Sequence, residues 1–154
     1  MIRSFRLPVL LGIAVVAVDL TTKRMAANRF ADGDLILIPG FLRFTYVENP
    51  GAAFSLFGDA GPFFGVAAIV VTVFILFALR HPRPRIEGVA FGLIIGGALG
   101  NLADRIFRGE GFLDGKVIDW VDLWWIPTFN LADSSITVAV ALLLIQAWRI
   151  RETS

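Results

Sequence analysis

Residues 88–105 read GVAFGLIIGGALGNLADR, an apolar stretch that ends in an asparagine, an aspartate and an arginine. Gly88, Gly92, Gly96 and Gly100 recur every four residues, so in a helix they form one stripe without side chains. Such stripes allow membrane helices to pack with their backbones close together. About 20 helical residues cross a hydrocarbon core of about 30 Å. The stretch therefore predicts a membrane-spanning helix that packs tightly against its neighbours.

The composition of the whole chain also indicates a membrane protein. Of its 154 residues, 56% are hydrophobic, whereas an ordinary soluble domain has about 45–50% apolar residues. Two further apolar stretches are nearly as long or longer, and a shorter one runs from Leu7 to Lys23. We therefore predict a single all-α membrane domain, residues 1–154, with a small extracytoplasmic cap of β-strands. Its four transmembrane helices are expected at about 7–23, 61–79, 88–105 and 131–148.

The first apolar stretch has a second interpretation, as a cleavable signal peptide, because Arg3 and Arg6 precede it. However, Asp19, Lys23 and Arg24 lie between the stretch and any cleavage site, a region that should be neutral in a signal peptide. We therefore expect this segment to be retained as a helix.

The positive charges predict how the helices are oriented, because short cytoplasmic segments are rich in lysine and arginine. Arginines precede the first span, join the second to the third, and follow the fourth: Arg3, Arg6, Arg80, Arg83, Arg85, Arg149 and Arg151. Four spans place all three segments on one side. Both termini are therefore expected in the cytoplasm, and segments 30–60 and 106–128 on the outer side.

The two outer segments carry different signals. Residues 35–38 and 41–47 are apolar, β-branched and aromatic runs separated by a Pro-Gly break, which predicts two short strands. The second segment begins with a glycine- and aspartate-rich loop. Three tryptophans of a kind suited to the membrane–water boundary follow that loop: Trp120, Trp124 and Trp125.

The residue inventory excludes several chemistries. The chain has no cysteine and one histidine, His81, so a thiol nucleophile, a disulfide, an iron–sulfur cluster and a zinc site with several histidines are all excluded. A net charge of +1 provides no basic field for nucleic acid. Hydrolytic chemistry would have to use carboxylates, hydroxyls or the lysines, Lys23 and Lys116.

Several carboxylates are expected at one level of the membrane. With a rise of about 1.5 Å per residue, Asp19, Asp104 and Asp133 each lie roughly 20–25 Å from the inner end of their helices. Asp119 approaches that level from the outer segment, with Asp114 and Asp122 nearby. Apolar surroundings raise the pKa of a carboxylic acid, and two adjacent acids cannot easily both ionise. This arrangement suits a general base with a general acid beside it.

Other interpretations of these acids remain open at this point. They could pair with Lys23, Arg105 or Arg108, or solvate the helix ends. They could also relay ions or protons in a small transporter, although the acids gather at the outer level and the inner halves of two spans are nearly all apolar. Ser134 and Ser135 are expected to form hydrogen bonds at the end of a helix, since no histidine is near them. A functional polar layer is favoured because ionisable groups inside membranes are costly to retain.

Five blocks of the sequence resemble those of the bacterial lipoprotein signal peptidases (signal peptidase II). They occur in the family's order, and together with the four spans the resemblance covers nearly the whole chain. The blocks are Asp19-Leu20-Thr21-Thr22-Lys23, Asn49-Pro50-Gly51-Ala52-Ala53-Phe54, Gly96-Gly97-Ala98-Leu99-Gly100-Asn101-Leu102-Ala103-Asp104-Arg105, Val117-Ile118-Asp119-Trp120 and Phe129-Asn130-Leu131-Ala132-Asp133.

The resemblance implies a multi-pass aspartic endopeptidase of the bacterial inner membrane with its active site near the outer face. Such enzymes remove signal peptides from diacylglyceryl-modified prolipoproteins by cutting before the lipidated cysteine, and they need no metal or organic cofactor. Besides that substrate, the implied partners are membrane lipid and globomycin-type inhibitors. By the same resemblance Asp119 and Asp133 are the catalytic pair. Substrate-binding residues would be Asn49, Gly51, Asn101, Arg105 and Asn130, and supporting residues Asp19, Lys23 and Asp104.

Overall fold

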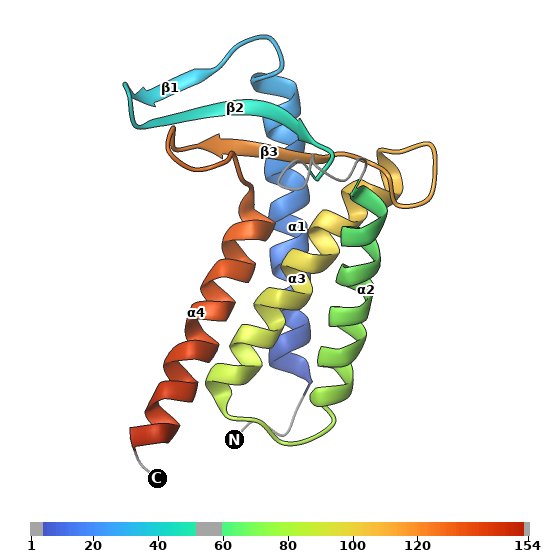
Figure 1. Ribbon diagram of the computed structural model, residues 1–154, viewed down its shortest axis with the longest axis vertical. Coiled ribbons are helices and arrows are strands. Elements are labelled where there is room, and N and C mark those ends of the chain that lie inside the picture. Colours follow the sequence, from blue (N-terminus) through green and yellow to red (C-terminus); the bar gives the residue numbers. More distant parts are fainter. Residues whose placement is uncertain (1–4, 52–59, 153–154) are drawn as a thin grey trace.

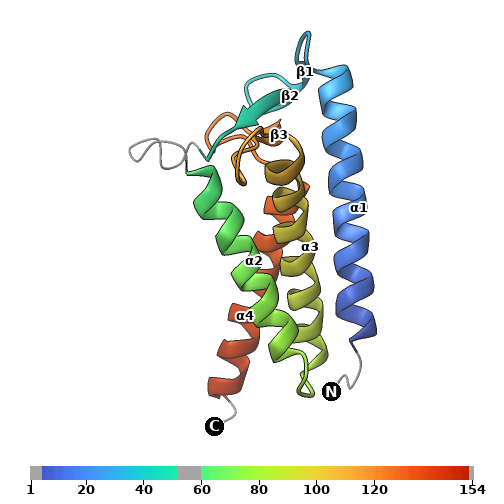
Figure 2. The same ribbon diagram turned by 90° about the vertical axis from the view of Figure 1, so that its right-hand side faces the viewer.

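Four helices and a three-stranded sheet make up the computed structural model, which describes residues 5–51 and 60–152. The helices lie side by side along the long axis, and the sheet lies across one end of them (Figures 1 and 2). In chain order the elements are α1 (Arg6–Arg29), β1 (Leu35–Ile38), β2 (Leu42–Asn49), α2 (Gly61–Ala78), α3 (Arg85–Phe107), β3 (Val117–Asp122) and α4 (Leu131–Glu152).

The structure confirms three of the four predicted spans. α2, α3 and α4 are long and apolar enough to cross a membrane. α1 is not among them, because Asp19, Lys23 and Arg24 interrupt its apolar run. α1 also continues beyond the predicted end at Lys23 to Arg29, so its last turns lie beside the sheet (Figure 2).

Polarity is arranged in the opposite way to that of a soluble protein. Leu10, Phe74 and Leu144 expose 65%, 69% and 66% of their surface on the outside of the bundle. Asp19 and Lys23, by contrast, are completely buried between the helices. Apolar side chains directed outward suit a hydrocarbon solvent, and this pattern agrees with a membrane location.

Glycines bring α3 into close contact with two neighbouring helices, as the stripe predicted. A Cβ atom added at Gly96 would lie 2.5 Å from Cβ of Val15 and 2.8 Å from the carbonyl oxygen of Gly12, both on α1. On the adjacent face, a Cβ at Gly97 would lie 2.5 Å from the carbonyl oxygen of Ala132 on α4. α3 is therefore the helix against which the others are positioned.

The sheet has the order β1-β2-β3, with antiparallel pairing throughout. β1 and β2 confirm the two predicted strands. β3 was not predicted as a strand; the sequence indicated only an aromatic part of the second outer segment. The first three residues of β3, Val117, Ile118 and Asp119, are all buried, so the sequence lacks the polar–apolar alternation that marks a strand with one exposed face. The pairing of Val47 with Asp119 places that acid over the ends of the helices that meet the sheet.

The close packing at Gly96 leads to a stability prediction. Gly96→Ala should lower the unfolding temperature in detergent, because the added methyl group overlaps Val15 and overpacking typically costs about 1–3 kcal/mol. Gly33→Ala is the matched control, since nothing lies within 4 Å of a Cβ at that position. Equal unfolding temperatures for the two variants would contradict close packing between α1 and α3.

Candidate active site

A lysine without exposed surface lies at the end of the bundle that meets the sheet. The Lys23 ammonium on α1 is 2.7 Å from Oδ2 of Asp19, one helical turn earlier, and 2.8 Å from Oδ2 of Asp104 on α3. It also donates a hydrogen bond to Oδ1 of Asn101 at 2.8 Å. An ammonium has three N–H donors, so these contacts satisfy it completely.

The two acids paired with Lys23 also hold backbone groups of other elements. Oδ1 of Asp19 accepts a hydrogen bond from the backbone N–H of Ala132, near the start of α4, at 2.9 Å. Asp104 accepts one from the N–H of Ile118 on β3 at 3.4 Å and one from Nε of Arg108 at 2.7 Å. The interpretation that these acids pair with cations is therefore correct for Asp19 and Asp104.

Asp119 and Asp133 have a different environment, because amide N–H groups contact both of their carboxylates. Asp119 accepts hydrogen bonds from Nδ2 of Asn130 at 2.7 Å and from Nδ2 of Asn49 at 2.8 Å. Asp133 accepts them from Nδ2 of Asn101 at 2.8 Å and from the backbone N–H of Asn130 at 3.2 Å. Within residues 5–51 and 60–152 neither acid forms a salt bridge.

Asn130 connects the two acids and is completely buried. While its side-chain and backbone N–H groups donate to Asp119 and Asp133, its Oδ1 accepts a hydrogen bond from the backbone N–H of Asp133 at 2.9 Å. Phe129, the preceding residue, pairs with Val121 on β3. This bridge holds Asn130 beside the strand that carries Asp119.

Gly51 orients the remaining amide. Its N–H donates to Oδ1 of Asn49 at 2.8 Å, which leaves Nδ2 of Asn49 for Asp119. The φ angle of Gly51 is +107°, a conformation in which a side chain would be strained. A Cβ there would also lie 3.3 Å from the Phe64 ring.

The predicted catalytic pair and four of the five predicted substrate-binding residues line a cavity of about 380 Å³. Asn130 and the three predicted supporting residues, Asp19, Lys23 and Asp104, do not line it. One end is polar and the other is apolar, with walls from α2, α3 and α4. The polar end is lined by Asn49, Asn101, Arg105, Asp119 and Asp133, and the apolar end by Ala67, Ala68, Val71, Ile94 and Ala98.

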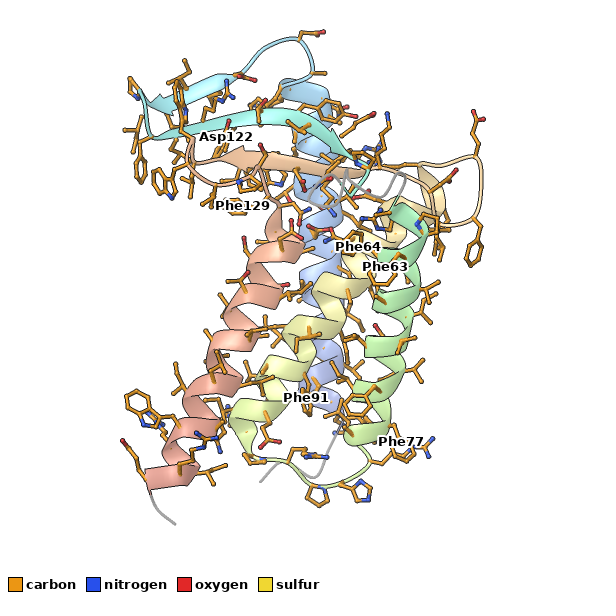
Figure 3. All side chains as sticks on the ribbon, viewed as in Figure 1. Phe63, Phe64, Phe77, Phe91, Asp122 and Phe129 are labelled. Carbon is orange, nitrogen blue, oxygen red and sulfur yellow. The ribbon has the colours of Figure 1, made fainter. Side chains whose placement is uncertain are left out.

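Arg105 is nearly buried at the polar end of the cavity. Its guanidinium carbon lies 5.5 Å from the centre of the Phe64 ring, and Figure 3 shows Phe64 at the end of α2 nearest the sheet. Its Nη1 has no hydrogen-bond partner among the residues that the structure describes. A donor in that position is available to a bound carbonyl or carboxylate.

Burial raises the pKa of Asp119 from its ordinary value of 3.8 to about 6; the Asn49 hydrogen bond opposes this rise, and the negative charge of Asp133 adds to it. Asp122, on the same strand, behaves in the opposite way. The N–H of Trp124 and the charge of Arg43 hold the pKa of Asp122 below its ordinary value. Asp122 and Asp114 do not line the cavity; Asp114 instead accepts a hydrogen bond from the N–H of Gly111.

Sequence reasoning missed the wall that α2 contributes to the site. Phe64, Ala67, Ala68 and Val71 line the cavity, and their positions follow the i, i+3, i+4, i+7 spacing of one helical face. The sequence did contain a signal for this wall, because one aromatic residue and three smaller residues share that face of the helix. Ser134 and Ser135, in contrast, confirm the prediction, since their hydroxyls bond to backbone carbonyls of Asn130 and Ala132.

Comparison with known proteins agrees with this geometry. The family model described as "Signal peptidase (SPase) II" matches residues 11–149. The chain belongs to the signal peptidase II family. This membership supports aspartic-type hydrolysis that removes signal peptides from prolipoproteins, and the transporter interpretation has no support.

Relatives of this signal peptidase II match it over nearly their full length. The lipoprotein signal peptidase of Symbiobacterium thermophilum is 39% identical over 90% of this chain and 92% of its own. That of Syntrophotalea carbinolica is 37% identical over 95% of this chain and 93% of its own. A solved bacterial membrane enzyme structure matches with a TM-score of 0.80 and 30% identity, over 96% of this chain and 89% of its own.

The environment of Asp119 predicts how stability depends on pH. Its pKa is higher in the folded than in the unfolded chain, so the folded state favours the protonated acid and loses stability as the pH rises from about 4 through 6. Relative to Asp119→Asn, the wild type should therefore become less stable over this range, by on the order of 2–3 kcal/mol. Unfolding temperatures of both proteins at pH 4 and pH 7 measure the change.

Asp122→Asn provides a control of opposite sign. The pKa of Asp122 is lowered on folding, so its carboxylate stabilises the wild type at pH 7 and this contribution is lost as the pH falls. If the difference in unfolding temperature between the wild type and Asp119→Asn were the same at pH 4 and pH 7, the raised pKa of Asp119 would be contradicted.

Proposed function

We propose that Asp119 and Asp133 are the catalytic pair of this peptidase, and that it cuts prolipoproteins just before the diacylglyceryl-modified cysteine. The observation that carries the proposal is the contrast among four acids at one level. Asp19 and Asp104 are paired with Lys23, whereas Asp119 and Asp133 accept hydrogen bonds from amides, form no salt bridge within residues 5–51 and 60–152, and face the cavity.

The carboxylates supply both proton transfers that peptide hydrolysis requires. One of the two carboxylates, in its ionised form, takes a proton from water as the water oxygen bonds to the scissile carbonyl carbon, and the other, in its protonated form, donates its proton to the carbonyl oxygen. As the C–N bond breaks, the first acid passes its proton to the leaving amine. The second acid takes back its proton from the hydroxyl group as the new carboxyl C=O bond forms. The reaction needs no metal ion or organic cofactor.

The rest of the site suits an extended, lipidated peptide. Arg105 would donate to a substrate carbonyl through its unpaired Nη1, while Asn49, Gly51, Asn101 and Asn130 bind substrate and orient the acids. The apolar end of the cavity suits an acyl chain of the modified cysteine. Globomycin-type inhibitors would occupy the same cavity. Asp19, Lys23 and Asp104 would support the site from below.

We further propose that α1 is a fourth span and that the protein lies in the bacterial inner membrane with both termini cytoplasmic. α1 exposes Leu10, Ile13 and Val18, while its buried Lys23 pairs with Asp19 and with Asp104, which also binds Arg108. The arginines of the α2–α3 connection and of the end of α4 lie at the opposite end from the sheet (Figure 1). This topology places the active site near the outer face.

Cleavage of a modified precursor tests the proposed catalytic pair. Purified wild-type protein in detergent should release the signal peptide from a diacylglyceryl-modified prolipoprotein and leave the unmodified precursor intact. Asp119→Asn and Asp133→Asn should each lower kcat by about 10²–10⁴-fold, because each removes a proton-transfer group. Asp122→Asn is the matched control and should retain activity, since Asp122 contacts Arg43 rather than the cavity. Full activity of either dyad variant would disprove the assignment.

The pH dependence of kcat/KM tests which acid serves as the base. If Asp119 must be ionised, kcat/KM should fall as the pH decreases below about 6. A profile that rises as the pH falls through this range would instead assign the proton to Asp119.

A further inference from the structure

The edge of the cap carries exposed aromatic side chains that the catalytic site does not use. We call Phe41, Trp124, Trp125 and Ile126 the cap tip; they expose 43%, 57%, 62% and 41% of their surface. The rings of Phe41 and Trp125 lie 4.8 Å apart, so the β1–β2 turn and the segment after β3 form one surface. The neighbouring edge strand β1 also exposes all four of its apolar side chains.

A polar cluster holds the cap tip in place. Trp124 has a φ of +64°, which is unusual for a residue other than glycine and persists only where the surroundings impose it. Its N–H donates to Oδ1 of Asp122 at 2.8 Å, and its ring lies 5.6 Å from the guanidinium carbon of Arg43. Arg43 in turn binds Asp122 at 2.6 Å and Asp34 at 2.8 Å. Asp122 and Arg43 therefore hold the exposed Trp124 ring in a fixed position.

The direction in which the cap projects indicates what covers this surface. The sheet extends sideways past the outer end of α4, and the segment after β3 lies on the side of the sheet that faces the helices (Figure 1). Figure 3 shows Phe129 on that side and Asp122 near the end of the strand. A bilayer that surrounds α2, α3 and α4 extends beneath any part that projects from their outer ends. Tryptophan is the residue that such interfaces favour.

The cap tip is directly connected to the active site. Val121 and Phe129 exchange backbone hydrogen bonds of 2.9 and 3.0 Å, which close the loop that carries Trp124 and Trp125. Asp119 lies two residues before one side of this closure, and Asn130 directly follows the other. A displacement of the tip along the membrane normal would therefore move both residues.

We propose that the cap tip inserts into the lipid interface and thereby sets the depth at which Asp119 meets the scissile bond. The inference of insertion is supported by the exposed apolar surface and its position, and it does not depend on the proposed function. The depth-setting role rests on the proposed function, because the scissile bond of a lipid-anchored substrate lies at a fixed distance from the membrane.

Quenching of tryptophan fluorescence by lipid tests insertion. Trp120→Phe combined with Trp148→Phe leaves Trp124 and Trp125 as the only tryptophans among the four in the chain. This protein is reconstituted in phosphatidylcholine vesicles with or without bromine atoms near the top of the acyl chains. We expect bromine to quench most of the fluorescence and aqueous iodide to quench little of it.

A tryptophan on the far side of the cap provides the control. Gly33→Trp, with the four natural tryptophans changed to phenylalanine, places the probe in the exposed segment between α1 and β1, and it should respond to iodide rather than bromine. Quenching of Trp124 and Trp125 by iodide alone would show that the tip lies in water. Quenching by neither agent would show that protein, such as a second copy, covers it. Both results would overturn insertion.

Activity in two environments tests the depth-setting role. Trp124→Ser combined with Trp125→Ser should lower kcat/KM several-fold in vesicles and leave it unchanged in detergent, where no bilayer fixes the depth. Equal losses in both media, or no loss in vesicles, would overturn this role. If the wild type cleaved no lipidated precursor in either medium, the proposed function would fail, while the quenching result would still decide insertion.

Discussion

The ammonium group of Lys23, enclosed where the helix bundle meets the sheet, connects α1, α3, α4 and β3. Removing one partner of a buried ion pair typically costs about 3–5 kcal/mol, since it leaves a charge uncompensated. Here one cation binds two carboxylates, Asp19 and Asp104, from different helices. Those carboxylates then bind the N–H groups of Ala132 and Ile118. The cluster thus fixes the register of α1 and α3 and the starting points of α4 and β3.

The proposed catalytic chemistry depends on the hydrogen-bond donors that this cluster orients toward Asp119 and Asp133. Lys23 donates a hydrogen bond to Oδ1 of Asn101, so Nδ2 of the same amide is directed to Asp133. Asp119 accepts hydrogen bonds from amides and forms no salt bridge with any residue that the structure describes, and burial raises its pKa. One layer therefore contains two kinds of acid: Asp19 and Asp104 pair with Lys23, whereas Asp119 and Asp133 accept hydrogen bonds from amides. The near-neutral net charge of the chain does not reveal this division.

Much of this arrangement could be predicted from local sequence. The glycine stripe of α3 predicted its close packing, and the helical rise placed Asp19, Asp104 and Asp133 at one level. The contact of Lys23 with Asp19 follows from their spacing of four residues. The contact with Asp104 could not be predicted, because it depends on how α1 packs against α3, and the sequence does not show which residues of the two helices meet.

Two other features depend on tertiary structure in the same way. β3 could not be recognised, because its first three residues are buried on both faces and show no alternation. The display of Trp124 depends on a positive φ that Asp122 and Arg43 stabilise, and a tryptophan gives no sign of such a turn in the sequence.

In the proposed mechanism Asp119 and Asp133 activate water and do not themselves attack the peptide bond. Single-turnover cleavage of a diacylglyceryl-modified prolipoprotein in H₂¹⁸O, followed by mass spectrometry of the products and of the enzyme, tests this role. Attack by activated water should place one ¹⁸O atom in the new carboxylate of the signal peptide and none in either aspartate. A signal peptide without ¹⁸O, or label in the side chain of Asp119 or Asp133, would contradict it.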